Sequence, residues 1–255
     1  MRLGKRPAHP PDHAHHSVRF GSFFAADLPA PPPACDWTGP VGGKWELGNN
    51  DIVGDCACVA PANAVICLSA NTDAPKRLAL SDILDAYRAF GGWDGVAGDA
   101  TDGGCVVSDV LAGWANVGIG GDKIAAFAEV DHSDTTQIKR AISLLGCCVV
   151  GVELPAAAQA WGTDPWPAVG PDLSGPLAPG SWGGHAAVIL KYDANGVWIV
   201  TWGRLVFVPS VTLAAYLSEA WAIANADFIS CNGLAPTGLD LAKMVADCQA
   251  MRDRA

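Results

Sequence analysis

Charge is scarce in this sequence: of its 255 residues only 16% are charged, whereas 50% are apolar. The sixteen Lys and Arg residues are scattered and the net charge is -10, so nothing indicates binding to nucleic acid or to an anionic membrane. The chain also lacks an apolar run of about 18 residues that would span a bilayer. Its basic start lacks the apolar core of a signal peptide. We therefore expect a compact soluble globule with no nucleic-acid partner, no membrane span and no signal peptide.

Metal and nucleotide signatures are missing as well. The nine cysteines show neither the paired CxxC spacing of zinc sites nor the density of a small disulfide scaffold. Four of the six histidines lie in the first 34 residues, where we expect a solvated arm rather than a metal site. The glycine-rich stretch GGWDGVAGDATDGG lacks the lysine of a phosphate-binding loop. We therefore expect no cofactor and no metal, and most cysteines reduced and buried as small apolar side chains.

Composition divides the chain into three parts. Residues 1–34 carry seven of the eighteen prolines, and the tract LPAPPPA predicts an extended arm that wraps the body. Residues 35–231 form the expected folded domain, and residues 232–255 predict an amphipathic closing helix. Because the arm is short for an inhibitory prodomain, we do not expect activation by its removal.

Hydrophobic periodicity places helices first and strands later in the domain. Helices are expected at 80–92, 107–119 and 134–146, the first two capped by Ser81 and Ser108 and the third ending at Gly146. The expected strands are 147–154, 185–193, 196–203 and 204–210, after a long loop at 155–184, and a helix from 210 runs into a final strand. Cys147 and Cys148 should face opposite sides of their strand and remain unpaired. This order predicts an α+β fold.

One cysteine stands out by its position. In GNNDIVGDCACVAPANAV, a glycine-rich approach leads into a helix-like segment that Cys56 opens. A helix N-terminus stabilises a thiolate, the nucleophilic form of cysteine, which an ordinary thiol supplies poorly at neutral pH. Pro61, however, lacks the N–H that would bond near Ala57, so we expect the helix to be kinked there or to start later.

An imidazolium close to the sulfur would stabilise a thiolate further, and only two histidines lie beyond the arm. His132 belongs to the polar turn EVDHSDTT, where we expect a surface position. His185 follows GSWGG and opens an apolar strand. A histidine at a strand start is usually structural. However, His185 follows Cys56 by 129 residues, close to the roughly 130 to 150 that separate papain-type pairs.

Four segments in order resemble the papain-like (C1-like) cysteine peptidase family, particularly its compact bacterial and phage-encoded branch. CDWTGPVGGKWELGNNDIVGDC resembles the opening DW…V.PV.NQG.CGSC, and GDCACVAPANA resembles the bacterial GSCTAFALAAA, which places the nucleophile at Cys56. GGHAAVILKYD resembles the histidine strand GGHAVVIVGYD, and WIVTWG resembles W.IKNSWG. The resemblance implies a papain-like fold over about residues 36–224. Its helical N-terminal half carries Cys56 and its antiparallel β half carries His185, between an extended proline-rich arm and a C-terminal helix.

The resemblance also implies further site residues, and here the sequence departs from the family. The asparagine that orients the histidine falls on Val200, which cannot hydrogen-bond, and the adjacent Thr201 is expected to point to the opposite face of its strand. The glutamine that stabilises the oxyanion falls on Asn50, whose side chain is one methylene shorter. The expected lining of the substrate cleft is Trp202, which would cover the Cys–His pair, together with Thr201, Gly103 and Gly104.

Two functions remain open. A papain-like hydrolase would cut an amide bond of a peptide or peptidoglycan stem through Cys56 and His185, with Asn50 and the Cys56 amide holding the oxyanion. Alternatively, loss of the orienting asparagine indicates a catalytically impaired module that serves a phage virion or another assembly, with phage structural proteins as partners. A transglutaminase or NlpC/P60-type enzyme fits less well, because it lacks the DW opening. The expected location is the host cytoplasm or a phage virion.

Overall fold

The structure is a computed structural model that describes residues 1–10, 18–19, 29–229, 234–238 and 240. In this part of the chain, eight strands form one sheet in the order β1-β3-β8-β4-β5-β6-β7, with β2 paired to β5. Only β1 and β3 run parallel among these pairs. The strands are β1 (Val18–Arg19), β2 (Cys35–Asp36), β3 (Ile124–Val130), β4 (Cys148–Leu154), β5 (Gly183–Tyr192), β6 (Gly196–Thr201), β7 (Arg204–Pro209) and β8 (Leu217–Asn225).

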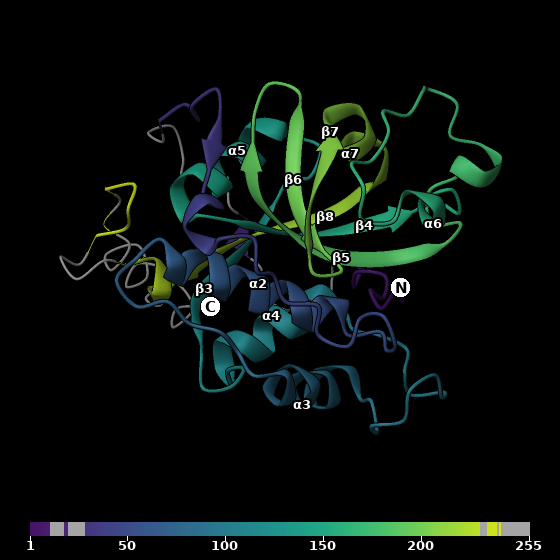
Figure 1. Cartoon of the computed structure of the whole chain (residues 1–255), viewed down its shortest axis with the longest axis horizontal. Coiled ribbons are helices and arrows are strands. Elements are labelled where there is room, and N and C mark those ends of the chain that lie inside the picture. Colours follow the sequence, from purple (N-terminus) through teal and green to yellow (C-terminus); the bar gives the residue numbers. More distant parts are fainter. Residues whose placement is uncertain (11–17, 20–28, 230–233, 239, 241–255) are drawn as a thin grey trace.

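Helices cover the sheet. Figure 1 shows α2, α3 and α4 together below the strands, with α5 and α7 above them. The α-helices are α2 (Cys56–Ala70), α3 (Leu80–Gly91), α4 (Val107–Asn116), α5 (Thr135–Leu145), α6 (Ala158–Trp161) and α7 (Ser210–Tyr216). Three short 3-10 helices are η1 (Gly39–Val41), η2 (Gly175–Leu177) and η3 (Ala226–Phe228). The expected α+β class, with helices first and an antiparallel β half later, is confirmed.

The central helix α2 packs against β5, β6 and α3. All its residues from Cys56 to Ser69 are buried, as in a helix that is apolar on every side and enclosed by other elements. It begins at Cys56, so of the two alternatives expected from Pro61, a kink or a later start, the later start is wrong. An internal proline costs a helix about 3 kcal/mol. Burial of the surrounding apolar side chains offsets this cost, which is why the helix forms from Cys56 onward.

Helix boundaries follow the expected positions, but two of the expected caps are wrong. Asp134 caps α5 by accepting from the N–H groups of the next turn, and Gly146 ends this helix with a φ of 86°. Ser81 and Ser108 lie inside α3 and α4 rather than at their N-caps. At the start of α3 the carboxylate of Asp82 instead accepts from the N–H of Ala79, at 3.2 Å.

The expected strands are present, and α7 runs directly into β8. β3 has no counterpart among the predicted strands, because its sequence IAAFAEV is rich in alanine and carries a glutamate, both weak strand formers. The segment 155–184 contains the short helices α6 and η2, and β5 begins at Gly183, earlier than expected.

The seven cysteines that the structure describes are all free, and six of them are buried. This confirms the expected reduced and buried state for these residues, including the unpaired Cys147 and Cys148. None of the described helices combines the length and apolar character that crossing a membrane requires.

Part of the arm contacts the body. The Tyr192 hydroxyl donates to the Pro32 carbonyl, and His9 lies 2.9 Å from the Asp109 carboxylate. The remaining arm histidines, His13, His15 and His16, lie outside the described residues, as does most of the expected C-terminal helix at 232–255.

Candidate functional site

Cys56 is the first residue of α2 and is 2% exposed. Because α2 packs against β5, its N-terminus lies beside the start of that strand. The backbone N–H of Ala186 donates to the Cys56 sulfur at 3.4 Å, and His185 directly precedes this alanine. The fold therefore brings together the cysteine and the histidine that the sequence spacing paired.

The His185 ring is buried, with 1% exposure, and is held on two sides. Its Nε2 atom lies 2.7 Å from the Thr201 hydroxyl, and the Trp202 ring stacks on it with centroids 4.4 Å apart. Trp182 stacks in turn on Trp202, at 5.9 Å. Within the described residues the buried Nδ1 atom has no hydrogen-bond partner.

The expectation that Thr201 faces away from His185 is wrong, and strand register explains why. Val188 on β5 pairs with Val200 on β6, so these two side chains share one face of the sheet. Because side chains alternate along a strand, Thr201 shares the other face with His185. The hydroxyl of Thr201 therefore contacts the His185 imidazole, whereas the Val200 side chain lies on the other face of the sheet. Trp202 has a φ of 45°, so β6 ends in a turn that lays the indole on the imidazole.

Neither member of the pair is charged at neutral pH in this conformation. Burial, with a smaller effect of the Asp55 carboxylate, raises the pKa of the Cys56 thiol to about 12, although N–H groups of Ala186 and Gly4 lower it. Burial lowers the pKa of His185 to about 3. The described state is therefore a neutral thiol beside a neutral imidazole.

Asn50, the expected oxyanion residue, is buried and its amide is engaged. Its Nδ2 atom donates to the Val53 carbonyl at 3.3 Å, and its own carbonyl accepts from the N–H of Arg2 at 2.8 Å. The nearby Asp55 precedes Cys56, and burial raises the pKa of Asp55 to about 7. Asn50 thus lies in the loop that leads to Cys56, with its side-chain amide bonded to Val53 and Asp55 of the same loop.

Residues 1–6, which we call the cleft segment, occupy the space beside Cys56 and His185. Figure 1 shows this segment in purple between β5 and the helices. The N–H of Lys5 donates to the Gly184 carbonyl at 3.1 Å, and the indole of Trp202 donates to the Arg2 carbonyl at 3.3 Å. Cys105 accepts from the N–H of Arg6 and donates to the Gly4 carbonyl, both at 2.7 Å. The cleft segment is thereby hydrogen-bonded on both sides.

Glycines allow this close approach. A Cβ on Gly4 would lie 1.9 Å from the Gly54 carbonyl oxygen, and a Cβ on Gly104 would lie 2.0 Å from the Gly4 oxygen. A Cβ on Gly184 would lie 2.5 Å from the Lys5 oxygen. Only glycine leaves room at these three positions. Gly104 therefore contacts the backbone of the cleft segment, and the Gly103 carbonyl accepts from the Arg6 guanidinium. Their place in a substrate cleft stays a prediction.

Side chains anchor the same segment. Arg2 pairs with Asp102 at 2.8 Å, and Lys5 lies between two glutamates, Glu153 and Glu219. The Asp102 carboxylate also accepts from the Tyr87 hydroxyl and from backbone N–H groups. Burial raises the pKa of Asp102, but these hydrogen bonds outweigh burial and hold the pKa below its ordinary value. These acidic partners do not follow from local sequence, because nothing near them marks a basic partner 100 or more residues away along the chain.

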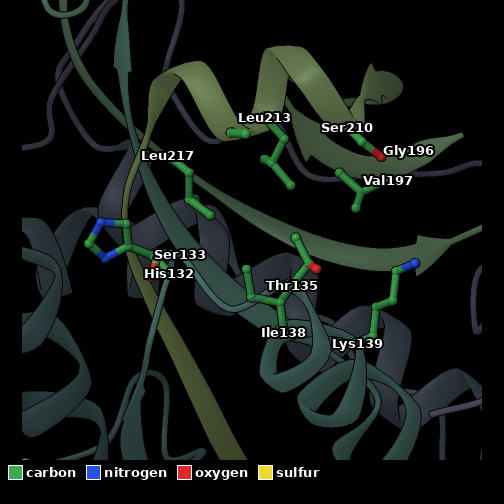
Figure 2. A pocket seen from close by; sticks show the side chains of 11 residues that line it. His132, Ser133, Thr135, Ile138, Lys139, Gly196, Val197, Ser210, Leu213 and Leu217 are labelled. Atoms are coloured by element: carbon green, nitrogen blue, oxygen red, sulfur yellow. The ribbon is translucent and has the colours of Figure 1, made fainter.

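A separate cavity of about 290 Å³ lies on the other side of the sheet, between α5, α7 and β6. Figure 2 shows His132 and Lys139 on opposite sides of it, with Leu213 and Leu217 between them. His132 is exposed, as expected for its polar turn. None of the Cys56 site residues lines this cavity, so the second histidine of the body plays no part in that site.

Solved structures of cysteine proteases have the same fold. Xylellain from Xylella fastidiosa superposes with a TM-score of 0.61 at 15% identity, covering 88% of this chain and 97% of its own. The Carica candamarcensis protease CMS1MS2, in complex with E-64, gives 0.54 at 17% identity over 75% of this chain and 98% of its own. Procathepsin B from Trypanosoma congolense gives 0.58 at 11% identity, over 87% and 86%. No protein-family model and no curated protein matches the chain. These similarities confirm the papain-like fold.

Proposed function

We propose that this chain is a papain-like cysteine hydrolase that cuts an amide bond of a peptide or peptidoglycan stem, and that the cleft segment holds it closed. The observation that carries the proposal is the position of Cys56. It opens a buried helix in a cysteine-protease fold, against the strand that presents His185 with its Nδ1 atom unpartnered among the described residues. The peptide backbone in the cleft favours an extended peptide as substrate.

Catalysis follows from these positions once the segment leaves. Nδ1 of His185 accepts the Cys56 proton, and the resulting thiolate attacks the carbonyl carbon of the amide. The C–N bond breaks, and the imidazolium gives its proton to the leaving amine. Water, deprotonated by the same imidazole, then hydrolyses the thioester and releases the acid.

Supporting residues keep the pair in place during these steps. The Thr201 hydroxyl fixes the imidazole ring, and Trp202 shields one face of it from water. The N–H of Cys56 at the start of the helix stabilises the oxyanion. Asn50 contributes a second donor if its amide turns from Val53 toward the cleft.

The closed state accounts for the uncharged pair. The N–H of Gly4 faces the Cys56 sulfur, so the segment covers the nucleophile directly. Withdrawal of the segment hydrates both groups, which lowers the thiol pKa and raises the imidazole pKa. Among the similar structures, procathepsin B and the procathepsin L 3 of Tenebrio molitor are proenzymes by name.

The test is the rate at which iodoacetamide alkylates Cys56 as a function of pH, read by peptide mass spectrometry. Gly4→Ala in the full chain opens the cleft, and Gly4→Ala with His185→Ala is the comparison. We expect the first variant to reach a plateau well below pH 8 and the second to lose it. An unreactive Cys56, or one with the same titration in both variants, would refute the hydrolase. It would favour the alternative of a non-catalytic module in a phage virion or another assembly.

A further inference from the structure

Two buried thiols face each other beside the cleft segment. Cys58 lies in the first turn of α2 and Cys105 lies just before α4, and both residues are 0% exposed. Their sulfur atoms are 3.9 Å apart, and no other pair of cysteines in the described part of the chain is hydrogen-bonded through sulfur. Gly91, at the end of α3, leaves room for the Cys105 sulfur, because a Cβ there would lie 2.8 Å from it.

A disulfide needs only a small further approach of these atoms. The sulfurs of a disulfide are about 2.05 Å apart, so those of Cys58 and Cys105 have to move about 1.9 Å closer. Because α2 and α4 already pack against each other, this movement requires no new contact between elements. The two residues are 47 positions apart, so the bond would close a long loop and restrict the unfolded chain.

Cys105 also holds the cleft segment by its backbone. Its N–H donates to the Gly4 carbonyl and its carbonyl accepts from the N–H of Arg6, both at 2.7 Å. Lys5, between these two residues, forms a parallel bridge with Cys105. Cys58 belongs to the helix that begins at Cys56. A bond between the two sulfurs would therefore tie the backbone that holds the segment to the helix that carries the covered thiol.

The chemistry assigns an order to the two sulfurs. The hydrogen bond to Cys105, together with burial, raises the pKa of Cys58 well above its ordinary value, so Cys58 keeps its proton and Cys105 reacts first. The Cys105 thiolate attacks one oxygen of a hydroperoxide, the O–O bond breaks, and a sulfenic acid and hydroxide form. The Cys58 sulfur then attacks the Cys105 sulfur, the S–O bond breaks, and the leaving hydroxide takes the Cys58 proton as water. Two thiols lose two electrons, and hydrogen peroxide is reduced to two molecules of water.

We infer that Cys58 and Cys105 form an oxidation site, at which a hydroperoxide converts the two thiols into a disulfide that ties the chain at Cys105 to α2. The inference does not rest on the proposed function, because Cys56 takes no part in the reaction. In the oxidised chain, the cleft segment is held by a backbone that can no longer move away from α2.

The test begins with the unmodified full chain. It is reduced, freed of reductant and treated with hydrogen peroxide, which is small enough to reach buried thiols through local opening. Remaining thiols are blocked in denaturant, and the tryptic peptides are read by mass spectrometry. Trypsin yields peptide 45–76, with Cys56, Cys58 and Cys67, and peptide 89–123, with Cys105 alone. We expect these two peptides to be joined, and fragmentation to place the bond at Cys58.

Single variants assign the bond independently. Cys58→Ala should lose the linked peptides, whereas Cys56→Ala and Cys67→Ala, the matched controls from the same helix, should retain them. The absence of linked peptides in the unmodified chain overturns the inference, as does a link that persists in Cys58→Ala. The first of these results needs no variant, so it decides the question even where Cys58→Ala does not fold.

The alkylation rate of Cys56 tests the tie itself. Because a fixed Cys105 opposes opening of the segment, we expect iodoacetamide to alkylate Cys56 about threefold more slowly in the oxidised chain than in the reduced chain. Cys58→Ala treated with the same peroxide should show no such slowing. An unchanged or faster rate in the oxidised chain refutes the tie. A slowing that persists in Cys58→Ala also refutes it, because the slowing then arises from oxidation of Cys56. Neither measurement needs hydrolysis, so failure of the proposed function is distinguishable from failure of this inference.

Discussion

Replacing one glycine tests whether the cleft segment controls Cys56. In Gly4→Ala, the new Cβ would lie 1.9 Å from the carbonyl oxygen of Gly54, a distance that real Cβ atoms do not adopt. The atom it meets belongs to the backbone of the loop before α2, so a rotamer change cannot relieve the contact. The segment therefore has to move away from Cys56.

The shift toward the open state can be estimated from the hydrogen bonds that hold the segment beside Cys56. Backbone hydrogen bonds contribute about 1 kcal/mol each, and the segment makes them with Asn50, Cys105 and Gly184. Overpacking against rigid neighbours costs about 1 to 3 kcal/mol and sometimes more. We take about 3 kcal/mol as the shift toward the open state, which corresponds to roughly 100-fold in its population.

The measurement is the alkylation rate of Cys56 at pH 8 in the full chain. We expect Gly4→Ala to react about 100-fold faster than the unmodified chain, since a thiol with a pKa of about 12 supplies almost no thiolate at this pH. Gly170→Ala is the matched control, because its Cβ would have no neighbour within 4 Å. A Gly4→Ala rate within threefold of this control would refute gating by the segment.

Three further predictions concern the pair itself, the first two in the Gly4→Ala background. Thr201→Val should lower kcat about 10-fold and shift its pH profile, whereas Thr201→Ser should retain both, because the hydroxyl positions the imidazole. Asp55→Asn should move the midpoint of Cys56 alkylation to lower pH, since the Asp55 carboxylate raises the thiol pKa. In the unmodified chain, burial lowers the His185 pKa from 6.5 to about 3, so the folded state binds a proton less readily than the unfolded state. Its contribution to stability is full above pH 6.5 and falls by about 1.4 kcal/mol per pH unit toward pH 3, a slope in urea unfolding that His185→Gln should remove.

The pairing of Cys56 with His185 was predictable from sequence, because motif order and spacing place both at element starts in this fold. The role of Thr201 was not, because it depends on register. Counting back from Trp202 selects Val200. However, Val200 pairs with Val188, so its side chain lies on the face of the sheet opposite to His185. A shift of one residue exchanges the two faces of a strand, and no local signal reports it.

The cleft segment escaped sequence reasoning for a different reason. Its sequence MRLGKR shows no periodicity, and its partners are single residues spread along the chain. Gly54, Gly104 and Gly184 make room for the cleft segment, and this is visible only once the fold brings their backbones to one place. The composition of residues 1–34 predicts an extended arm, but it gives no sign that residues 1–6 lie beside Cys56 and His185.

The direction of the segment explains how a peptide can lie intact beside the proposed nucleophile. Under the proposed function Cys56 attacks a carbonyl carbon, but its sulfur faces the N–H of Gly4, and the Gly4 carbonyl oxygen is bound to the N–H of Cys105. The segment runs parallel to the chain at Cys105, and a peptide in the opposite direction would exchange the order of N–H and C=O groups along the cleft. We therefore expect residues 1–6 to remain uncut during prolonged incubation of the unmodified chain at pH 7, as measured by intact mass. Cleavage within these residues that disappears in Cys56→Ser would show that the segment binds as a substrate. It would contradict the expectation that the segment covers Cys56 without being cut.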